Sequence, residues 1–304
     1  MSTPGFEEYL KLVLPEVDKS LKQQQEQFKP VLEPLYKVAL YQSYLFDSWE
    51  GPQPTEPRAL LIIGSLASQL AMGIHEALST GAGYAAGVQY RTVFELFLSA
   101  KLICEKDTQE RSDLYIDFGK VLQWDHLKRT MDAGLPVTAP MDLEKVKQEY
   151  ETLKNNYESR LTHWWSSVLW DSPKDFSSRR SIGTKGVCEY LDTAGITTSI
   201  YGKDAKFTEL EVRWFSILSL LTHPTILSEH AFVREDNGHF AIGWKLSPDI
   251  TRIAPLAAAS CGEIIADCAA GLSHPKAYEA RTFLKYLKDE AVKAQVKLDR
   301  GLKI

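Results

Sequence analysis

The chain has 304 residues, of which 44% are hydrophobic and 25% charged, and this ordinary globular composition excludes wholesale disorder. Its formal net charge of -5 argues against a general nucleic-acid coat, because such binding depends on clustered Lys and Arg. The N-terminus is acidic where a secretory signal needs a basic start, and polar residues interrupt every apolar stretch of membrane-spanning length. We therefore expect a cytoplasmic protein that does not enter a membrane.

The four cysteines form no recognisable motif. Cys104, Cys188, Cys261 and Cys268 include no Cys-X2-Cys pair, which is the spacing typical of zinc sites and redox motifs. We expect them to be reduced side chains that serve in packing, and we expect neither a metal nor a cofactor.

The N-terminal segment is predicted to be a helical arm. Apolar spacing indicates a helix from Phe6 to about Lys29, which Pro30 and Pro34 interrupt, and a second, tyrosine-rich helix over Leu35–Trp49. The run GPQPTEP follows and is typical of a linker. Its aromatic side chains favour an arm that docks on the rest of the protein.

The centre of the chain is predicted to be a helical hairpin. A buried helix over Arg58–Thr80, which contains small residues, precedes it. The hairpin's first arm runs from about Tyr84 to Cys104 and its second from Gln109 to Met131. Helical periodicity places one wide apolar face on the first arm, made of Ala86, Tyr90, Val93, Phe97, Ala100 and Cys104.

Two opposite charges on the first arm are the first candidate for a site. Arg91 and Glu95 lie one helical turn apart in a narrow polar stripe with apolar neighbours. They are either a solvated ion pair or a buried pair that orients a ligand. On the second arm, Asp117 and Lys120 either pair with each other or face Arg91 and Glu95.

A tryptophan cluster follows a charged surface helix over Met141–Leu161. Trp164, Trp165 and Trp170 fall within seven positions. Such a cluster either caps the core or forms a stacking wall for a planar ligand or base.

A proline marks the second candidate for a site. The apolar run Thr208–Ala231 is predicted to be a helix that Pro224 kinks directly after His223. The kink frees backbone carbonyls and exposes the imidazole. His230 lies two turns away, but no His-Glu-X2-His run accompanies the two histidines, so a metal site is not expected.

The C-terminal part completes an all-α prediction. Phe232–Trp244 has alternating apolar residues on both sides of Asp-Asn-Gly, which is typical of a β-hairpin. Ile250–Leu272 is predicted to be a core helix and Pro275–Lys297 an outer one. We predict a multi-helix bundle around the central antiparallel helical hairpin, with one small β-hairpin, divided into an arm at 1–50 and a bundle domain at 58–304.

Four short runs resemble a known family. YRTVFELFLSAKLI, DLYIDFGKVLQWDHLK, HWWSS and ILSLLTHP are similar, in that order, to a broad bacterial and viral family of helical proteins with no assigned activity. The resemblance covers roughly Ala59–His230 and implies that Arg91, Glu95, Trp164 or Trp165, and His223 are its signature positions.

A more remote likeness is to HEPN-type helical ribonucleases, which place an Arg and a His four to six positions apart near a helix start. The only run of this kind here is Arg234 to His239, inside the predicted β-hairpin. Arg213 and His223 are too far apart for the pattern.

Three hypotheses follow for function. The first is a ligand- or partner-binding module, in a defence or stress system, with a pocket that includes Arg91, Glu95, Trp165 and His223. The second is a metal-independent ribonuclease in which His223 is the general acid or base and Arg91 stabilises the phosphorane; equal RNA cleavage by wild type and His223→Ala would remove it. The third is a structural subunit that self-associates or binds a protein partner. RNA is a partner only under the second hypothesis.

Overall fold

A computed structural model describes residues 6–47, 49, 57–137, 142–153, 164–169, 183–198, 204–215, 233–236, 239–242 and 251–301. The helices and strands are α1 (Phe6–Phe46), α2 (Arg58–Ser79), α3 (Gly83–Glu105), α4 (Thr108–Asp132), α5 (Leu143–Leu153), α6 (Trp165–Leu169), α7 (Thr184–Thr193), α8 (Phe207–Leu210), the π-helical turn η3 (Glu211–Phe215), β1 (Val233–Asp236), β2 (His239–Ile242), α12 (Ile253–Gly271) and α13 (Ala277–Asp299). The strands pair antiparallel with Asp236 opposite His239. The predictions of an all-α bundle and of one β-hairpin are confirmed.

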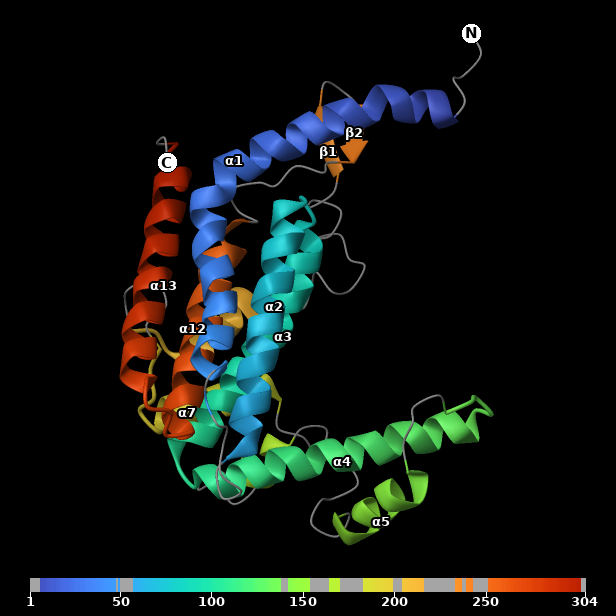
Figure 1. Ribbon diagram of the computed structural model, residues 1–304, viewed down its shortest axis with the longest axis vertical. Helices are drawn as coiled ribbons and strands as arrows, with labels where there is room; N and C mark the ends of the chain where they lie inside the picture. Colours follow the sequence, from blue (N-terminus) through green and yellow to red (C-terminus); the bar gives the residue numbers. More distant parts are fainter. Residues whose placement is uncertain are drawn as a thin grey trace.

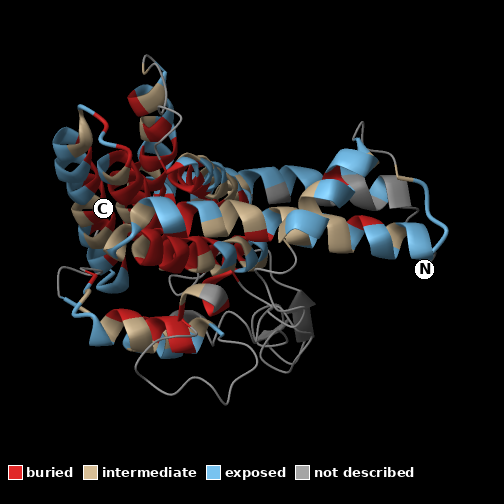
Figure 2. Ribbon diagram, turned by 90° about the horizontal axis from the view of Figure 1, so that it is seen from below, coloured by how far each residue is buried: buried red, intermediate tan, exposed pale blue. Residues whose placement is uncertain are grey.

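One apolar core holds the main body together. The helices α2, α3, α12 and α13 and the C-terminal half of α1 share it, and Figure 2 shows buried residues concentrated inside this bundle. Each helix contributes fully or almost fully buried side chains, represented by Leu35, Ile63, Phe97, Ile264 and Leu284. Helix α12 is buried along nearly its whole length, and its many alanines allow its neighbours to approach closely.

The helical arm at the N-terminus differs from the prediction. Helix α1 is continuous through Pro15, Pro30 and Pro34, so the expected interruption is wrong. A proline inside a helix costs about 3 kcal/mol, but Val31 and Leu35 beside two of these prolines are fully buried, and each such burial stabilises by about 1.5–3 kcal/mol. Figure 1 shows that α1 bends on its way to the N-terminus rather than breaking.

The two arms of the central hairpin diverge. Helix α4 runs out sideways from the foot of the bundle, and α5 folds back beside it (Figure 1). Of the apolar side chains on α4, Phe118 is buried but Leu122 is exposed. The sequence of α4 explains the departure, because it has too few apolar residues to cover α3 along its length.

Polar side chains fix the start of α4. Arg111 is buried and its Nη1 lies 2.8 Å from Glu105 Oε2 on α3. Its Nη2 donates a hydrogen bond of 3.2 Å to the hydroxyl of Tyr190 on α7. These contacts explain why the first turn of α4 is held at the bundle while the rest projects.

The remaining helices agree with the prediction where the structure describes them. Helices α2, α3, α12 and α13 begin and end within a few residues of the expected positions. Helix α7 closes at Gly195, whose φ of 75° suits glycine. The long helix expected from Thr208 begins as α8 and η3, and its continuation lies outside the described residues. Two described helices, α2 and α12, are long and apolar enough to cross a membrane, a property that the buried core helices of soluble proteins share.

Candidate functional site

The predicted Arg91–Glu95 pair forms on α3. Arg91 Nη2 lies 3.4 Å from Glu95 Oε1, and the two side chains are 42% and 34% exposed. A pair of this exposure contributes little to stability. Burial raises the pKa of Glu95, and the neighbouring Arg91 acts in the opposite direction. The pair is therefore neither the fully solvated ion pair nor the fully buried pair that the sequence allowed, because both side chains are partly exposed to water.

Glu95 shares a small cavity with two of the predicted tryptophans. Its side chain lines a space of about 280 Å³ together with Trp164 and Trp165, and both indole rings are buried. Helices α3, α4 and the start of α6 each provide part of the wall. The other lining residues are Thr92, Leu96, Ser99, Tyr115, Phe118, Gly119 and Leu122.

The orientation of Trp164 is fixed by its neighbours. Its Nε1 donates a hydrogen bond of 3.3 Å to Ser99 Oγ, which in turn donates to the main-chain oxygen of Glu95 at 3.0 Å. The ring of Tyr115 meets Trp164 edge-on at 5.4 Å between centroids. Because its N–H is already satisfied and its ring is packed, Trp164 offers a preorganised wall.

Two other predicted site residues that the structure describes do not join this cavity. Asp117 and Lys120 pair with each other on α4 at 3.2 Å, which is the first of their two alternatives, and neither lines the cavity. His223 and Trp170 lie outside the described residues, so the pocket between the hairpin and the kinked helix remains a prediction.

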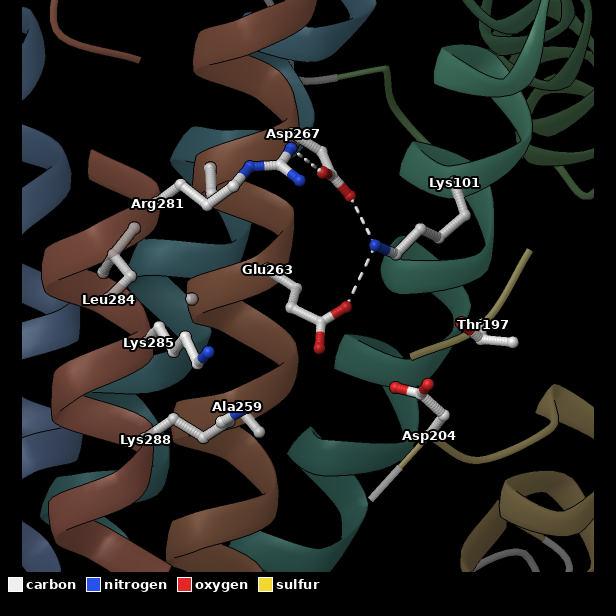
Figure 3. Close-up of a pocket in the computed structure, with 12 residues that line it drawn as sticks. Lys101, Thr197, Asp204, Ala259, Glu263, Asp267, Arg281, Leu284, Lys285 and Lys288 are labelled. Atoms are coloured by element: carbon white, nitrogen blue, oxygen red, sulfur yellow. Dashed lines mark hydrogen bonds and ion pairs between the residues drawn. The ribbon is translucent and has the colours of Figure 1, made fainter. Parts of the chain in front are cut away.

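A second cavity contains charges that the sequence interpretation missed. Lys101 Nζ on α3 lies 2.7 Å from Asp267 Oδ2 and 2.9 Å from Glu263 Oε2 on α12. Arg281 on α13 adds an ion pair of 2.9 Å with the other oxygen of Asp267 (Figure 3). The Lys101 side chain is only 12% exposed. Burial acts to lower the pKa of Lys101, but the two carboxylates outweigh it and the pKa is raised.

This charged cluster forms one end of a cavity of about 270 Å³. Lys285 and Lys288 on α13 line one side of the cavity, and Thr197 and Asp204 line the other (Figure 3). The sequence contained a signal for it, because Glu263 and Asp267 are spaced i,i+4 in an otherwise apolar, alanine-rich helix. Because the sequence predicts this segment only as a core helix, the two carboxylates were not recognised as part of a site.

The cysteines belong to the packing. All four are free, and three are buried, while burial raises the pKa of the half-buried Cys104 to about 12. A thiol with so high a pKa is a poor nucleophile at neutral pH. Among the described residues, no group of three His, Cys, Asp or Glu is placed to hold a metal ion.

The fold and the two cavities define an all-α bundle protein with small cavities between its helices, each containing at least one carboxylate. Comparison with known families is more specific: the chain belongs to a family of unknown function (DUF5677), which matches residues 65–240. This confirms the resemblance to an uncharacterised family, while a bacterial or viral origin and the HEPN likeness stay predictions. No curated protein and no solved structure matches the chain. The matched segment contains the whole lining of the Glu95 cavity, whereas α12 and α13 lie beyond it.

Proposed function

We propose that the protein is a binding module that recognises a small planar ligand in the Glu95 cavity. The observation that supports this best is the convergence of one partly buried carboxylate and two buried indole rings on a single space of about 280 Å³. That volume is just below the usual range of about 300–1,000 Å³ for ligand sites, so it suits a ring-sized molecule.

The chemistry of the lining indicates the ligand class. Aromatic side chains stack on flat ring systems, and the stacking depends little on which base or heterocycle provides the ring. Glu95 provides a hydrogen-bond acceptor for the ligand. A hydrogen bond to its carboxylate is stronger here than in water, because the side chain is partly buried. A planar heterocycle with N–H donors, such as a nucleobase with an exocyclic amino group, satisfies both requirements.

Arg91 has a positioning role in this proposal. It lies 3.4 Å from Glu95 and does not line the cavity. The ion pair holds the carboxylate in its ionised form against the effect of burial, and it limits the rotamers available to Glu95. Loss of Arg91 therefore weakens binding through Glu95 rather than through a direct contact.

Isothermal titration calorimetry with adenine and with unsubstituted purine tests the proposal. We expect adenine to bind and purine to bind more weakly, because purine lacks the amino donor. Glu95→Gln should weaken adenine binding about tenfold, the usual cost of losing one charge-assisted hydrogen bond. Gly119→Leu should weaken it as well, because a Cβ at this cavity position meets open space and a larger side chain takes up part of the volume.

The matched control is Glu290→Gln, which removes an ion pair of 3.1 Å with Lys293 on α13 and does not line the Glu95 cavity. It should leave adenine binding unchanged. Absence of binding by both purines, or equal binding of adenine by wild type and Glu95→Gln, contradicts the proposal. RNA cleavage, a role in defence or stress response, and self-association stay predictions, and the ribonuclease hypothesis depends on His223 outside the described residues.

A further inference from the structure

The second cavity has a cationic wall on one helix. Arg281, Lys285 and Lys288 are spaced four and three residues apart, so they lie on one face of α13, and all three line the cavity. The Lys288 side chain is only 6% exposed. Lys285 makes no ion pair within 4 Å with any described residue. Figure 3 shows both lysines on the same side of the space.

An acidic wall faces this one. Asp204 lies across the cavity from Lys285 (Figure 3), and it also makes no ion pair with the residues that the structure describes. Glu263 lies between the two walls, and the hydroxyl of Thr198 donates a hydrogen bond of 2.9 Å to its Oε1. Outside the ion-pair network of Lys101, the cavity is thus polarised, with the positive charges of α13 on one side and Asp204 opposite.

The charges within the cluster already satisfy one another. Lys101 bridges Glu263 and Asp267, and Arg281 forms an ion pair with the second carboxylate oxygen of Asp267. This network joins α3, α12 and α13, so its first role is structural. Among the described residues, Lys285 and Asp204 take no part in this network, and they lie on opposite walls.

We infer that this cavity binds a small zwitterion of the amino-acid type. Its carboxylate contacts Lys285 and Lys288, and its ammonium group contacts Asp204 and Glu263. Among the described residues neither Lys285 nor Asp204 makes an ion pair, so a simple anion leaves Asp204 uncompensated, a simple cation leaves Lys285 uncompensated, and a ligand with both charges fits best. The volume of about 270 Å³ limits the ligand to a small molecule. The site is distinct from the Glu95 cavity and does not depend on the function proposed there.

A thermal-shift screen of the full chain against the twenty free amino acids, each tested separately, is the first experiment. We expect at least one of them to raise the melting temperature. Calorimetry then compares that amino acid with its N-acetyl derivative, which lacks the positive charge, and with its amide, which lacks the negative one. Each derivative should bind at least about tenfold more weakly, the cost of losing one charge-assisted contact.

Two variants assign the contacts. Lys285→Gln and Asp204→Asn each remove a wall charge that takes no part in the ion pairs of the described residues, so both should fold, which circular dichroism checks. Lys285→Gln should reduce the preference for the free acid over its amide, and Asp204→Asn the preference for the free amine over its N-acetyl form. Lys293→Gln, on the same helix but outside this cavity, is the matched control and should change neither preference.

The results that overturn the inference are equally specific. One is that none of the twenty amino acids raises the melting temperature. Another is that the N-acetyl derivative or the amide binds as tightly as its parent. A third is that Lys285→Gln and Asp204→Asn retain the full wild-type discrimination. Any of these leaves the charged cluster with its structural role alone.

Discussion

Buried polar side chains in this protein are held by contacts from distant parts of the chain. His274 is the clearest case: its Nε2 lies 2.9 Å from the main-chain oxygen of Leu45, and its Nδ1 accepts the N–H of Lys276 at 3.1 Å. Because Nδ1 accepts, Nε2 is the protonated nitrogen that donates to Leu45. The rings of Phe46 and Trp49 pack against the imidazole. This arrangement requires the neutral form of His274.

His274 therefore gives the protein a defined pH dependence. Burial lowers its pKa below the ordinary value of 6.5, so the folded protein binds fewer protons than the unfolded chain between the lowered pKa and 6.5. The free energy of unfolding should fall as the pH falls through this window. Urea unfolding at pH 7.5 and 5.5 should show a smaller difference between these two pH values for His274→Gln than for wild type.

A residual pH dependence is expected in that variant, since burial lowers the pKa of His75 in the same direction. His126→Gln, which replaces an exposed histidine on α4, serves as the control and should behave as wild type. The assignment is wrong if His274→Gln retains the full difference between the two pH values.

At the scale of helices, two glycines have opposite roles. On α2, a Cβ at Gly64 lies 3.5 Å from Cys268 Cβ of α12, so there is room for little more than a methyl group. On α4, a Cβ at Gly119 meets nothing within 4 Å. Gly64 thus allows two core helices to approach, whereas Gly119, which lines the Glu95 cavity, makes no close helix contact and adds flexibility to the unfolded chain.

Substitutions at the two positions should have opposite effects on stability. Gly119→Ala should raise the free energy of unfolding by roughly 0.5–1 kcal/mol, because alanine is the better helix former. Gly64→Leu should lower it by about 1–3 kcal/mol through overpacking. Urea titrations measure both, and a destabilised Gly119→Ala or a neutral Gly64→Leu contradicts this account of the helix contacts.

The helices themselves could be predicted from the sequence, but their directions could not. Apolar periodicity identified α2 and α3 and the apolar face of α3 around Tyr90 and Phe97, since burial and helical spacing are local properties. The projection of α4 depends on Arg111, whose partners Glu105 and Tyr190 come from two other helices. Such contacts between distant residues leave no periodic pattern.

The same limit applies to the sites. Glu95 and the tryptophans were identified because each is unusual in its own segment, although only the fold shows that they share a cavity. Lys101 was missed because its partners Glu263 and Asp267 lie on another helix. The continuity of α1 was mispredicted because tertiary packing outweighs the cost of its prolines.

For the whole molecule, the first 50 residues are expected to be more than an appendage. The C-terminal half of α1 contributes fully or almost fully buried side chains to the shared core, namely Phe28, Val31, Leu32, Leu35, Val38, Ala39 and Leu45. Each large apolar side chain stabilises by about 1.5–3 kcal/mol when buried, and a typical domain has only about 5–15 kcal/mol of net stability.

Two truncations test this expectation. Deletion of residues 1–50 should prevent folding of the remainder, seen as loss of a cooperative thermal transition by circular dichroism. Deletion of residues 1–20 should leave the transition nearly unchanged, since the side chains described there are exposed. A cooperative transition at the wild-type temperature after removal of residues 1–50 would show instead that 58–304 is an independent domain.

The contact between α3 and α12 has a consequence for biosynthesis. The Sγ of Cys104 donates to the main-chain oxygen of Asp267 at 3.7 Å, across 163 residues of sequence, and Lys101 reaches its carboxylates over a similar span. At about 5–20 residues per second, a ribosome needs roughly 10–30 seconds to make that much chain. For this interval the nascent α2 and α3 have neither the counterions of Lys101 nor the apolar cover of α12. The bundle therefore closes only after α12 has been made, and its first helices expose apolar surface until then.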